Sequence, residues 1–132
     1  MVDWKPVSYP SMSPYLICQA AEDLITFLES AFGGVLLRRF DRPDGSLMHV
    51  EVRIDDSVVM IGGGSSGVPT APTHVHLYVE DAMTTFARAV AAGGSVVREP
   101  AQGSDDDLRG GVQDPWGTTW WIATQQPRNA RS

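Results

Sequence analysis

One order of elements occurs twice in this chain, and this internal repeat restricts the fold more than any other feature of the sequence. Each half has a short apolar run, then a stretch with apolar residues at helical spacing, and then two glycines, which end helices. The helical stretches cover residues 22–32 and 80–91. The apolar runs are residues 15–18 and 74–79, and the glycine pairs are Gly33-Gly34 and Gly93-Gly94. The repeat predicts two copies of one structural unit.

Three further strands are predicted after each glycine pair. In each half, the first of these strands contains an arginine, and the last two are joined by a tight turn. The turn is Asp55-Asp56 in the first half and Asp114-Pro115-Trp116-Gly117 in the second, where proline and glycine suit a type I turn. The strands cover 35–40, 47–54 and 57–61, and then 95–99, 109–113 and 118–124. Each half is therefore predicted as a βαβββ unit in an α+β protein.

The two units are predicted to form a single domain. Residues 62–72 between them are rich in glycine, serine and proline, as is typical of a flexible linker. Residues 101–107 are expected to form a solvated loop for a similar reason. The expected parts are an N-terminal arm at 1–12, the domain at 13–124 with module one at about 13–62 and module two at about 73–124, and a tail at 125–132.

The charge of the chain argues against two classes of partner. Its 132 residues carry a formal net charge of -6, and the ten basic residues are scattered. Nucleic acids and anionic membrane surfaces are bound through clusters of lysine and arginine. The chain also shows no apolar stretch near the roughly 20 residues of a spanning helix and no apolar core of a signal peptide. We expect a cytoplasmic protein without nucleic-acid or membrane partners, whose single cysteine, Cys18, packs as a small hydrophobic residue.

Six short segments, in this order and spacing, are similar to a known family. They are Pro14-Tyr15-Leu16, Ala31-Phe32-Gly33, 48–53, 77–81, 89–93 and Asp114-Pro115-Trp116-Gly117. The chain resembles the vicinal oxygen chelate superfamily of glyoxalase I, bleomycin-resistance proteins and extradiol dioxygenases, and within it the PhnB-like branch. The resemblance implies a curved, mixed, eight-stranded sheet whose inner face forms a cup for a small molecule. It also implies a homodimer, which Trp4 and Tyr9 of the arm would help to clasp.

Strand alternation predicts which side chains face this cup. In residues 47–54, Met48, Val50, Val52 and Ile54 are expected on the core face, with Leu47 and the polar residues opposite. Trp116 and Trp121 are interpreted either as platforms for a flat ligand or as packing residues. Tyr15 and Tyr78 either bind a ligand or border the sheet. The predicted ligand-binding residues are Tyr15, Met60, His76, Tyr78, Gln113, Trp116 and Trp121, and the predicted catalytic residues are His49, Glu51 and His74.

Metalloenzymes of this family hold their metal with residues on the first and last strand of each module. The corresponding positions here are Ser13, Met60, His74 and Trp121, of which only His74 is a good ligand. We therefore expect no metal cofactor. In the alternative, His49, Glu51, His74 and His76 form a shifted site for a divalent metal; otherwise these residues are cross-strand partners and hydrogen-bonded walls.

Two classes of function follow from the resemblance. The first is a binding protein that holds a small aromatic or polar molecule in the cup without a metal. The second is an enzyme, either a metal-dependent lyase or dioxygenase with shifted ligands, or a metal-free lyase or isomerase with His49, Glu51 or His74 as general base. A protein of this fold with no small-molecule ligand is a third interpretation.

Overall fold

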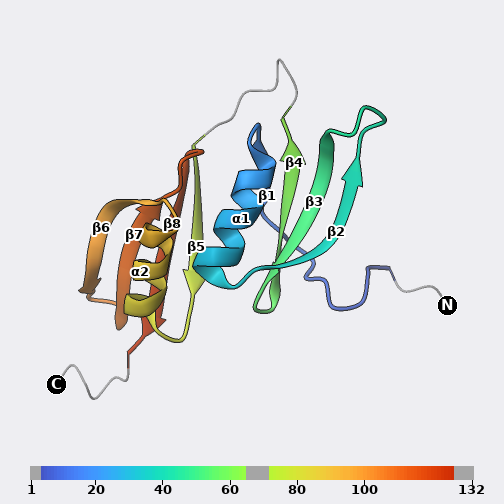
Figure 1. The fold of residues 1–132 in the computed structure, drawn as a ribbon. Coiled ribbons are helices and arrows are strands. Elements are labelled where there is room, and N and C mark those ends of the chain that lie inside the picture. The colour runs from blue at the N-terminus through green and yellow to red at the C-terminus, as the bar shows by residue number, and fades with distance from the viewer. Residues whose placement is uncertain (1–3, 65–71, 127–132) are drawn as a thin grey trace. The chain divides into compact units, whose positions relative to one another are not determined.

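The computed structural model describes residues 4–64 and 72–126, which form two successive βαβββ modules (Figure 1). Module one contains β1 (Tyr15–Cys18), α1 (Ala21–Phe32), β2 (Val35–Asp41), β3 (Leu47–Ile54) and β4 (Ser57–Gly63). Module two contains β5 (Thr73–Tyr78), α2 (Ala82–Ala91), β6 (Ser95–Gln102), β7 (Asp107–Gln113) and β8 (Thr118–Gln125). The predicted α+β fold of two βαβββ modules is confirmed by these elements.

The sheets of the two modules have the same strand order. Within the described residues the order is β1-β4-β3-β2 in module one and β5-β8-β7-β6 in module two. β1 runs parallel to β4 and β5 runs parallel to β8, whereas the other neighbouring strands are antiparallel. Backbone hydrogen bonds thus divide the eight strands of the described part of the chain into two mixed four-stranded sheets.

Both helices have the boundaries that their sequences predict, to within two residues. α1 ends at Gly33, which has a left-handed φ of 68° and donates its N–H to the carbonyl of Glu29 at 3.1 Å. α2 begins after Asp81, whose carboxylate accepts a hydrogen bond from the backbone N–H of Thr84 at 3.2 Å. These contacts satisfy backbone groups that a helix end leaves without partners.

The two modules also share a β-bulge at the same place. In both, one residue of the strand after the helix is skipped in the pairing with the next strand. The pairs on either side of the bulge are Leu36 with Val52 and Arg38 with Glu51 in module one, and Val96 with Val112 and Arg98 with Gly111 in module two. Arg38 and Arg98 therefore occupy equivalent positions, and so do Glu51 and Gly111.

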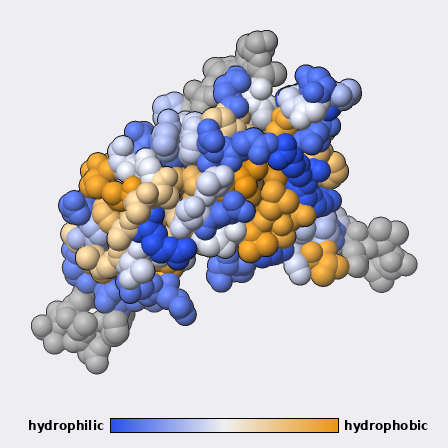
Figure 2. All heavy atoms as spheres, viewed as in Figure 1, coloured by the Kyte–Doolittle hydropathy of each residue, from blue (hydrophilic) through white to orange (hydrophobic). Residues whose placement is uncertain are grey.

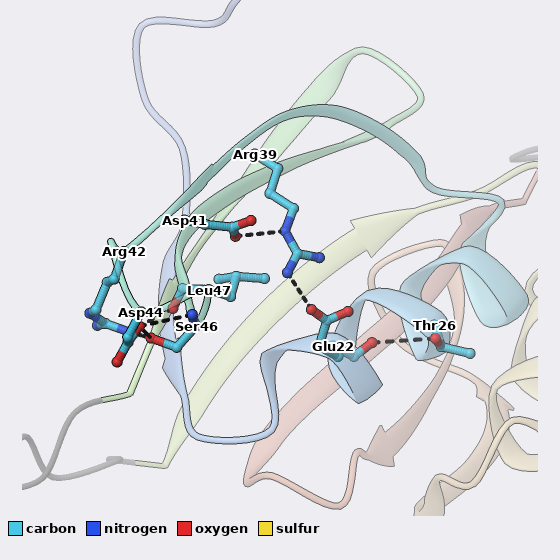
Figure 3. Close-up of polar contacts among 8 residues, drawn as sticks. All are labelled: Glu22, Thr26, Arg39, Asp41, Arg42, Asp44, Ser46 and Leu47. Atoms are coloured by element: carbon cyan, nitrogen blue, oxygen red, sulfur yellow. Dashed lines mark hydrogen bonds and ion pairs between the residues drawn. The ribbon is translucent and has the colours of Figure 1, made fainter.

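An ion pair identifies the face of the module one sheet that lies toward its helix. Arg39 of β2 contacts Glu22 of α1 (Figure 3) and pairs within the sheet with the fully buried Val50. Paired residues direct their side chains to the same face, so Val50 and Arg39 lie on the helix side. Arg38 and Glu51 then lie on the opposite face, which we call the polar face of module one.

In module two, α2 packs against β6, β7 and β8. A side chain at Gly110 would meet the ring of Phe86 from α2, so Gly110 lies on the helix side of the sheet. The next residue, Gly111, faces the other way, together with its sheet neighbour Trp121. We call this second surface the polar face of module two.

The start of β3 differs from the predicted alternation. Leu47 is buried and Met48 is 46% exposed, whereas we expect the reverse from the sequence. The cause is a second register shift, because Phe40 pairs with His49 and Asp41 pairs with Leu47, which leaves Met48 outside the pairing. The pairing between β2 and β3 is regular from His49 to Glu51, where the bulge described above follows.

Several predicted loop residues belong to strands. Gly62 and Gly63 continue β4, so the linker predicted at 62–72 begins later, and its residues 65–71 lie outside the described part of the chain. Asp107 begins β7, and Gln125 ends β8. The rest of the predicted tail, from residue 127, also lies outside the described residues.

Figure 2 shows hydrophobic residues on the surface of each module. Within residues 4–64 and 72–126, neither helix combines the length and the apolar character that crossing a bilayer requires.

Candidate ligand-binding faces

Each polar face contains a row of four residues, one from each strand of its sheet. The rows occupy equivalent positions because the two sheets share their strand order and their bulge. In module one the row is Tyr15, Met60, Glu51 and Arg38. In module two the row is His76, Trp121, Gly111 and Arg98.

Glu51 is the centre of a hydrogen-bonded cluster on the polar face of module one. Its side chain is almost fully buried and accepts two hydrogen bonds from Arg38, from Nε at 2.8 Å and from Nη2 at 3.1 Å. Tyr9 of the N-terminal arm donates its hydroxyl to Oε1, and Nε2 of His49 lies 2.9 Å from Oε2. The guanidinium of Arg38 also lies over the ring of Tyr9, 5.2 Å from its centroid. Both carboxylate oxygens are therefore occupied by protein groups.

This cluster keeps Glu51 ionised. The hydrogen bonds from Arg38 lower the pKa of Glu51 to about 2 and outweigh burial, which acts in the opposite direction. The same carboxylate raises the pKa of Tyr9 by accepting its hydrogen bond. A carboxylate with so low a pKa is a weak base, so Glu51 is suited to orienting His49 rather than to taking a proton from a ligand.

A glycine on β4 lets Tyr15 approach His49. A side chain at Gly62 would come within 3.0 Å of the Tyr15 ring, so the ring covers the space that this glycine leaves. The rings of Tyr15 and His49 stack with their centroids 5.7 Å apart, and the ring centroid of Phe40 lies 6.0 Å from that of His49. Tyr15 itself is 54% exposed. The predicted ligand residue Tyr15 and the predicted catalytic residue His49 thus lie together.

The polar face of module two has a comparable arrangement around Trp121. A side chain at Gly111 would come within 2.7 Å of the Trp121 ring, so the indole lies over this glycine. Trp121 Nε1 donates a hydrogen bond to Nδ1 of His74 at 3.1 Å, and the two rings are nearly parallel at an interplanar angle of 10°. Because Nδ1 of His74 accepts this bond, the neutral ring carries its proton on Nε2 and presents a donor there.

A second cluster on this face surrounds Arg109. The guanidinium contacts Asp107 at 2.6 Å and Asp105 at 3.0 Å, and its Nε donates to Nε2 of His76 at 3.1 Å. Tyr78 donates its hydroxyl to the same Asp107 at 2.8 Å. Burial and the charge of Arg109 lower the pKa of His76, which agrees with its role as acceptor. Asp107, expected in a solvated loop, is only 3% exposed because Arg109 and Tyr78 pair with it.

The family's four metal-ligand positions do not supply the donors that a divalent metal needs. Met60 contributes a soft thioether, and the indole nitrogen of Trp121 is a donor only and already binds His74. Across residues 4–64 and 72–126, no three His, Cys, Asp or Glu side chains are grouped so that they could hold a metal ion. His49 and Glu51 lie in module one, whereas His74 and His76 lie in module two.

Two further tryptophans, Trp116 and Trp120, lie in the hairpin between β7 and β8. Trp116 lies in the turn, and its backbone N–H donates to Asp114 at 2.9 Å. Trp120 is 1% exposed and donates Nε1 to the same carboxylate at 3.0 Å, so it is a core residue. Gln113, the remaining predicted ligand residue, is exposed at the end of β7 and pairs with Thr119.

A hollow of about 240 Å³ lies beside the hairpin between β2 and β3, and Figure 3 shows the polar contacts of several of its lining residues. Arg42 lines it, but its guanidinium donates to the carbonyls of Leu47 at 2.8 Å and Gly63 at 2.9 Å. Asp44 in turn accepts a hydrogen bond from the backbone of Ser46 at 2.9 Å. These contacts tie the hairpin to the end of β4, so we assign this arginine a structural role.

Comparison with known proteins agrees with the fold described above. Residues 13–122 match the family model of the glyoxalase/bleomycin resistance protein/dioxygenase superfamily. An uncharacterized protein of Mycobacterium bovis, Mb0911c, is 37% identical over 122 residues, which cover 84% of this chain and 80% of that protein. The crystal structure of TioX from Micromonospora sp. ML1 has a TM-score of 0.73 and 23% identity, covering 88% of this chain and 98% of its own. A PhnB protein from Bacillus cereus has a TM-score of 0.65 and 15% identity, covering 87% and 99%. These two structures show a shared fold.

Proposed function

This chain belongs to the glyoxalase/bleomycin resistance protein/dioxygenase superfamily, and on that premise we propose that it binds a small aromatic or polar molecule without a metal ion. The observation that carries the proposal is the position and exposure of the Trp121 indole. This residue stands at a family metal-ligand position, yet it offers a partly exposed indole that lies on the sheet above Gly111. An indole at this place supplies a flat surface for an aromatic ring instead of a ligand for a cation.

The hydrogen bond between Trp121 and His74 supports binding in a second way. It fixes the orientation of the indole, so little conformational entropy is lost when a ligand stacks on it. It also leaves the Nε2–H of a neutral His74 as a donor for a polar group of the ligand. A fixed aromatic surface beside a hydrogen-bond donor is typical of small-molecule sites.

The proposal is tested by titrating chelator-treated protein with 2-naphthamide, a neutral aromatic probe, and following tryptophan fluorescence. We expect saturable quenching that Trp121→Leu abolishes. Trp4→Leu is the matched control, because Trp4 is 81% exposed in the N-terminal arm of module one. Binding that survives Trp121→Leu would show that the aromatic surface lies elsewhere.

Metal independence needs its own measurement. We expect purified protein to contain less than stoichiometric metal and its melting temperature to stay unchanged on addition of Co²⁺, Ni²⁺, Mn²⁺ or Zn²⁺. A metal that binds the native state would raise the melting temperature with its concentration. A stoichiometric metal that chelation removes and addition restores would contradict the metal-free proposal.

A second function, a metal-free lyase or isomerase, is favoured by the hydrogen bond between His49 and Glu51. An ionised Glu51 accepts the Nε2–H of His49, which leaves Nδ1 with a lone pair that can take a proton from a ligand. In this function His49 is the general base and Glu51 is a positioning residue. The test is deuterium exchange into hydroxyacetone by metal-stripped protein, compared with His49→Asn. Exchange that is equal in the two proteins would exclude His49 as the base.

We also propose that the chain forms a homodimer through its outer strands. Within the described residues, β2 and β6 stand at the edges of their sheets and expose apolar side chains. These side chains are Val35, Leu36, Phe40, Val96 and Val97. Light scattering after gel filtration should give twice the mass of one chain, and a monomer mass at high protein concentration would contradict the proposal.

A further inference from the structure

Two arginines at equivalent positions have different neighbours. Arg38 of β2 and Arg98 of β6 follow the same bulge and face the polar side of their sheets. Arg38 stands opposite Glu51 and is held by two hydrogen bonds to its carboxylate. Arg98 stands opposite Gly111, which offers no side chain at all. The carboxylate that completes the row in module one is therefore absent from the sequence at the same place in module two.

No other protein group replaces this carboxylate in the part of the chain that the structure describes. Arg98 is exposed, and no hydrogen bond or ion pair joins it to another described residue. The other arginine on this face, Arg109, is already paired with Asp105 and Asp107. Of these two arginines, Arg98 is therefore the one whose guanidinium N–H groups are available to a ligand.

The surroundings of Arg98 match the requirements of a ligand that is both flat and negatively charged. One strand away lies Gly111, and beyond it lies Trp121, whose ring covers that glycine. A planar guanidinium can bind a carboxylate through two parallel hydrogen bonds. The chain has a net charge of -6, so its overall field repels anions, and attraction must come from a local cation.

We propose that the ligand of module two is an aromatic carboxylate, which places its ring on Trp121 and its carboxylate on Arg98. The ligand's carboxylate accepts hydrogen bonds from Arg98 in the way that Glu51 accepts them from Arg38 in module one. This inference rests on the proposed binding function and adds to it the chemical class of the ligand. Arg98 is the specificity-determining residue, and Trp121 is the aromatic surface.

The test uses two probes of nearly the same shape, 2-naphthoate and the neutral 2-naphthamide, with full-length, chelator-treated protein. Affinities are measured by tryptophan fluorescence and confirmed by calorimetry. A charge-assisted hydrogen-bond pair that is partly exposed to solvent is expected to favour the carboxylate by about ten-fold. Added salt should reduce this preference, because it screens an exposed ion pair.

Three variants assign the preference to its residue. Arg98→Gln is expected to bring the affinity for 2-naphthoate down to that for 2-naphthamide and to leave the amide unaffected. Arg98→Lys, which keeps the charge but loses the planar pair of donors, should restore only part of the difference. Arg88→Gln on α2 removes the same charge from the helix side and should change neither affinity.

The outcomes separate this inference from the proposed function beneath it. If both probes bind with equal affinity and Trp121→Leu abolishes both, the ligand need not be a carboxylate. This result would overturn the inference but keep the proposed binding of aromatic molecules. A preference for 2-naphthoate that Arg98→Gln does not change would also overturn it. Failure of both probes to bind would overturn the binding function itself, and the inference with it.

Discussion

The polar face of module one is completed by its own side chains, whereas that of module two is left open at the equivalent place. In module one, Arg38 and Glu51 pair with each other beneath Tyr9. In module two, Arg98 stands beside Gly111, without a partner among the described residues. The bulge before the arginine is shared by both modules, whereas the pairing beyond it stays regular after Arg38 and shifts again directly after Arg98. The exchange of Glu51 for Gly111 therefore leaves Arg98 as a candidate receptor for an anion, where Arg38 forms a structural ion pair.

Equivalent positions of a repeated fold can serve stability in one module and ligand binding in the other. A buried carboxylate that binds an arginine, a tyrosine and a histidine stabilises its own module and keeps external anions out. A glycine at the same position contributes no such contact, but it gives Trp121 room to lie on the sheet. On the proposed function, module one would use this position for stability and module two would use it for ligand access.

The largest expected effect comes from removing the charge that completes module one. Glu51→Gln should lower the free energy of unfolding by about 3 kcal/mol, because it leaves a cluster of donors around a neutral amide. Half of the Arg38 side chain is exposed, which keeps the loss at the lower end of the range for buried ion pairs. Urea unfolding measures the change. The control Glu22→Gln breaks the exposed pair with Arg39 and should cost less than about 1 kcal/mol.

The same carboxylate predicts how stability depends on pH. The pKa of Glu51 is about 2 in the folded protein and near its ordinary value of 4.5 when unfolded. Because the pKa of Glu51 is lower in the folded state, its ionised carboxylate stabilises the protein fully above pH 4.5. This contribution, about 3 kcal/mol, is lost as the pH falls toward 2. The stability difference between the natural protein and Glu51→Gln should therefore shrink across this window. A difference that stays constant down to pH 2 would show that its cause is not the charge.

Substituting either of the two glycines under aromatic rings should lower the free energy of unfolding by less than Glu51→Gln does, and the two losses can be compared directly. Gly111→Ala places a methyl group 2.7 Å from the Trp121 ring and should cost about 2 kcal/mol, with loss of the hydrogen bond to His74. Gly62→Ala meets Tyr15 at 3.0 Å, and this exposed ring can move aside, so we expect less than about 1 kcal/mol. Urea unfolding and near-ultraviolet circular dichroism measure both variants. Equal costs would mean that Trp121 is as free to move as Tyr15.

The smallest effect is expected from the N-terminal arm. Tyr9→Phe removes one of the hydrogen bonds to Glu51 and should lower the free energy of unfolding by about 1 kcal/mol. Combined with Glu51→Gln, the substitution should add almost nothing, because the two residues share one contact. Full additivity in this double-mutant cycle would show that Tyr9 stabilises the arm by other means.

The fold could be predicted from sequence because its signals are local. Helical spacing before a glycine pair and turn residues between short strands each involve a few neighbouring positions. For this reason the predicted bounds of the strand at Leu47–Ile54 agree with the structure. Strand alternation alone predicts the wrong faces for Met48 and Leu47, because the bulge beside them depends on pairing with β2 and cannot be recognised in the sequence of β3 itself.

The sites could be predicted only in part, because their partners come from distant positions. Alternation placed His74 and Trp121 on one face, where they do contact each other, although their roles in binding and catalysis stay predictions. Nothing in the sequence near Glu51 indicates that Tyr9, 42 residues earlier, donates to it. Asp107 lies in a stretch whose composition is typical of loops, and only Arg109 and Tyr78 explain its burial.

Cys18 on β1 makes the opening of module one observable by itself. It is the single cysteine of the chain, and its side chain is 2% exposed beside β4. A thiol reagent can therefore reach it only when that part of module one opens, and no other thiol adds to the signal. The labelling rate reports the local opening of β1 in a chain without any introduced cysteine.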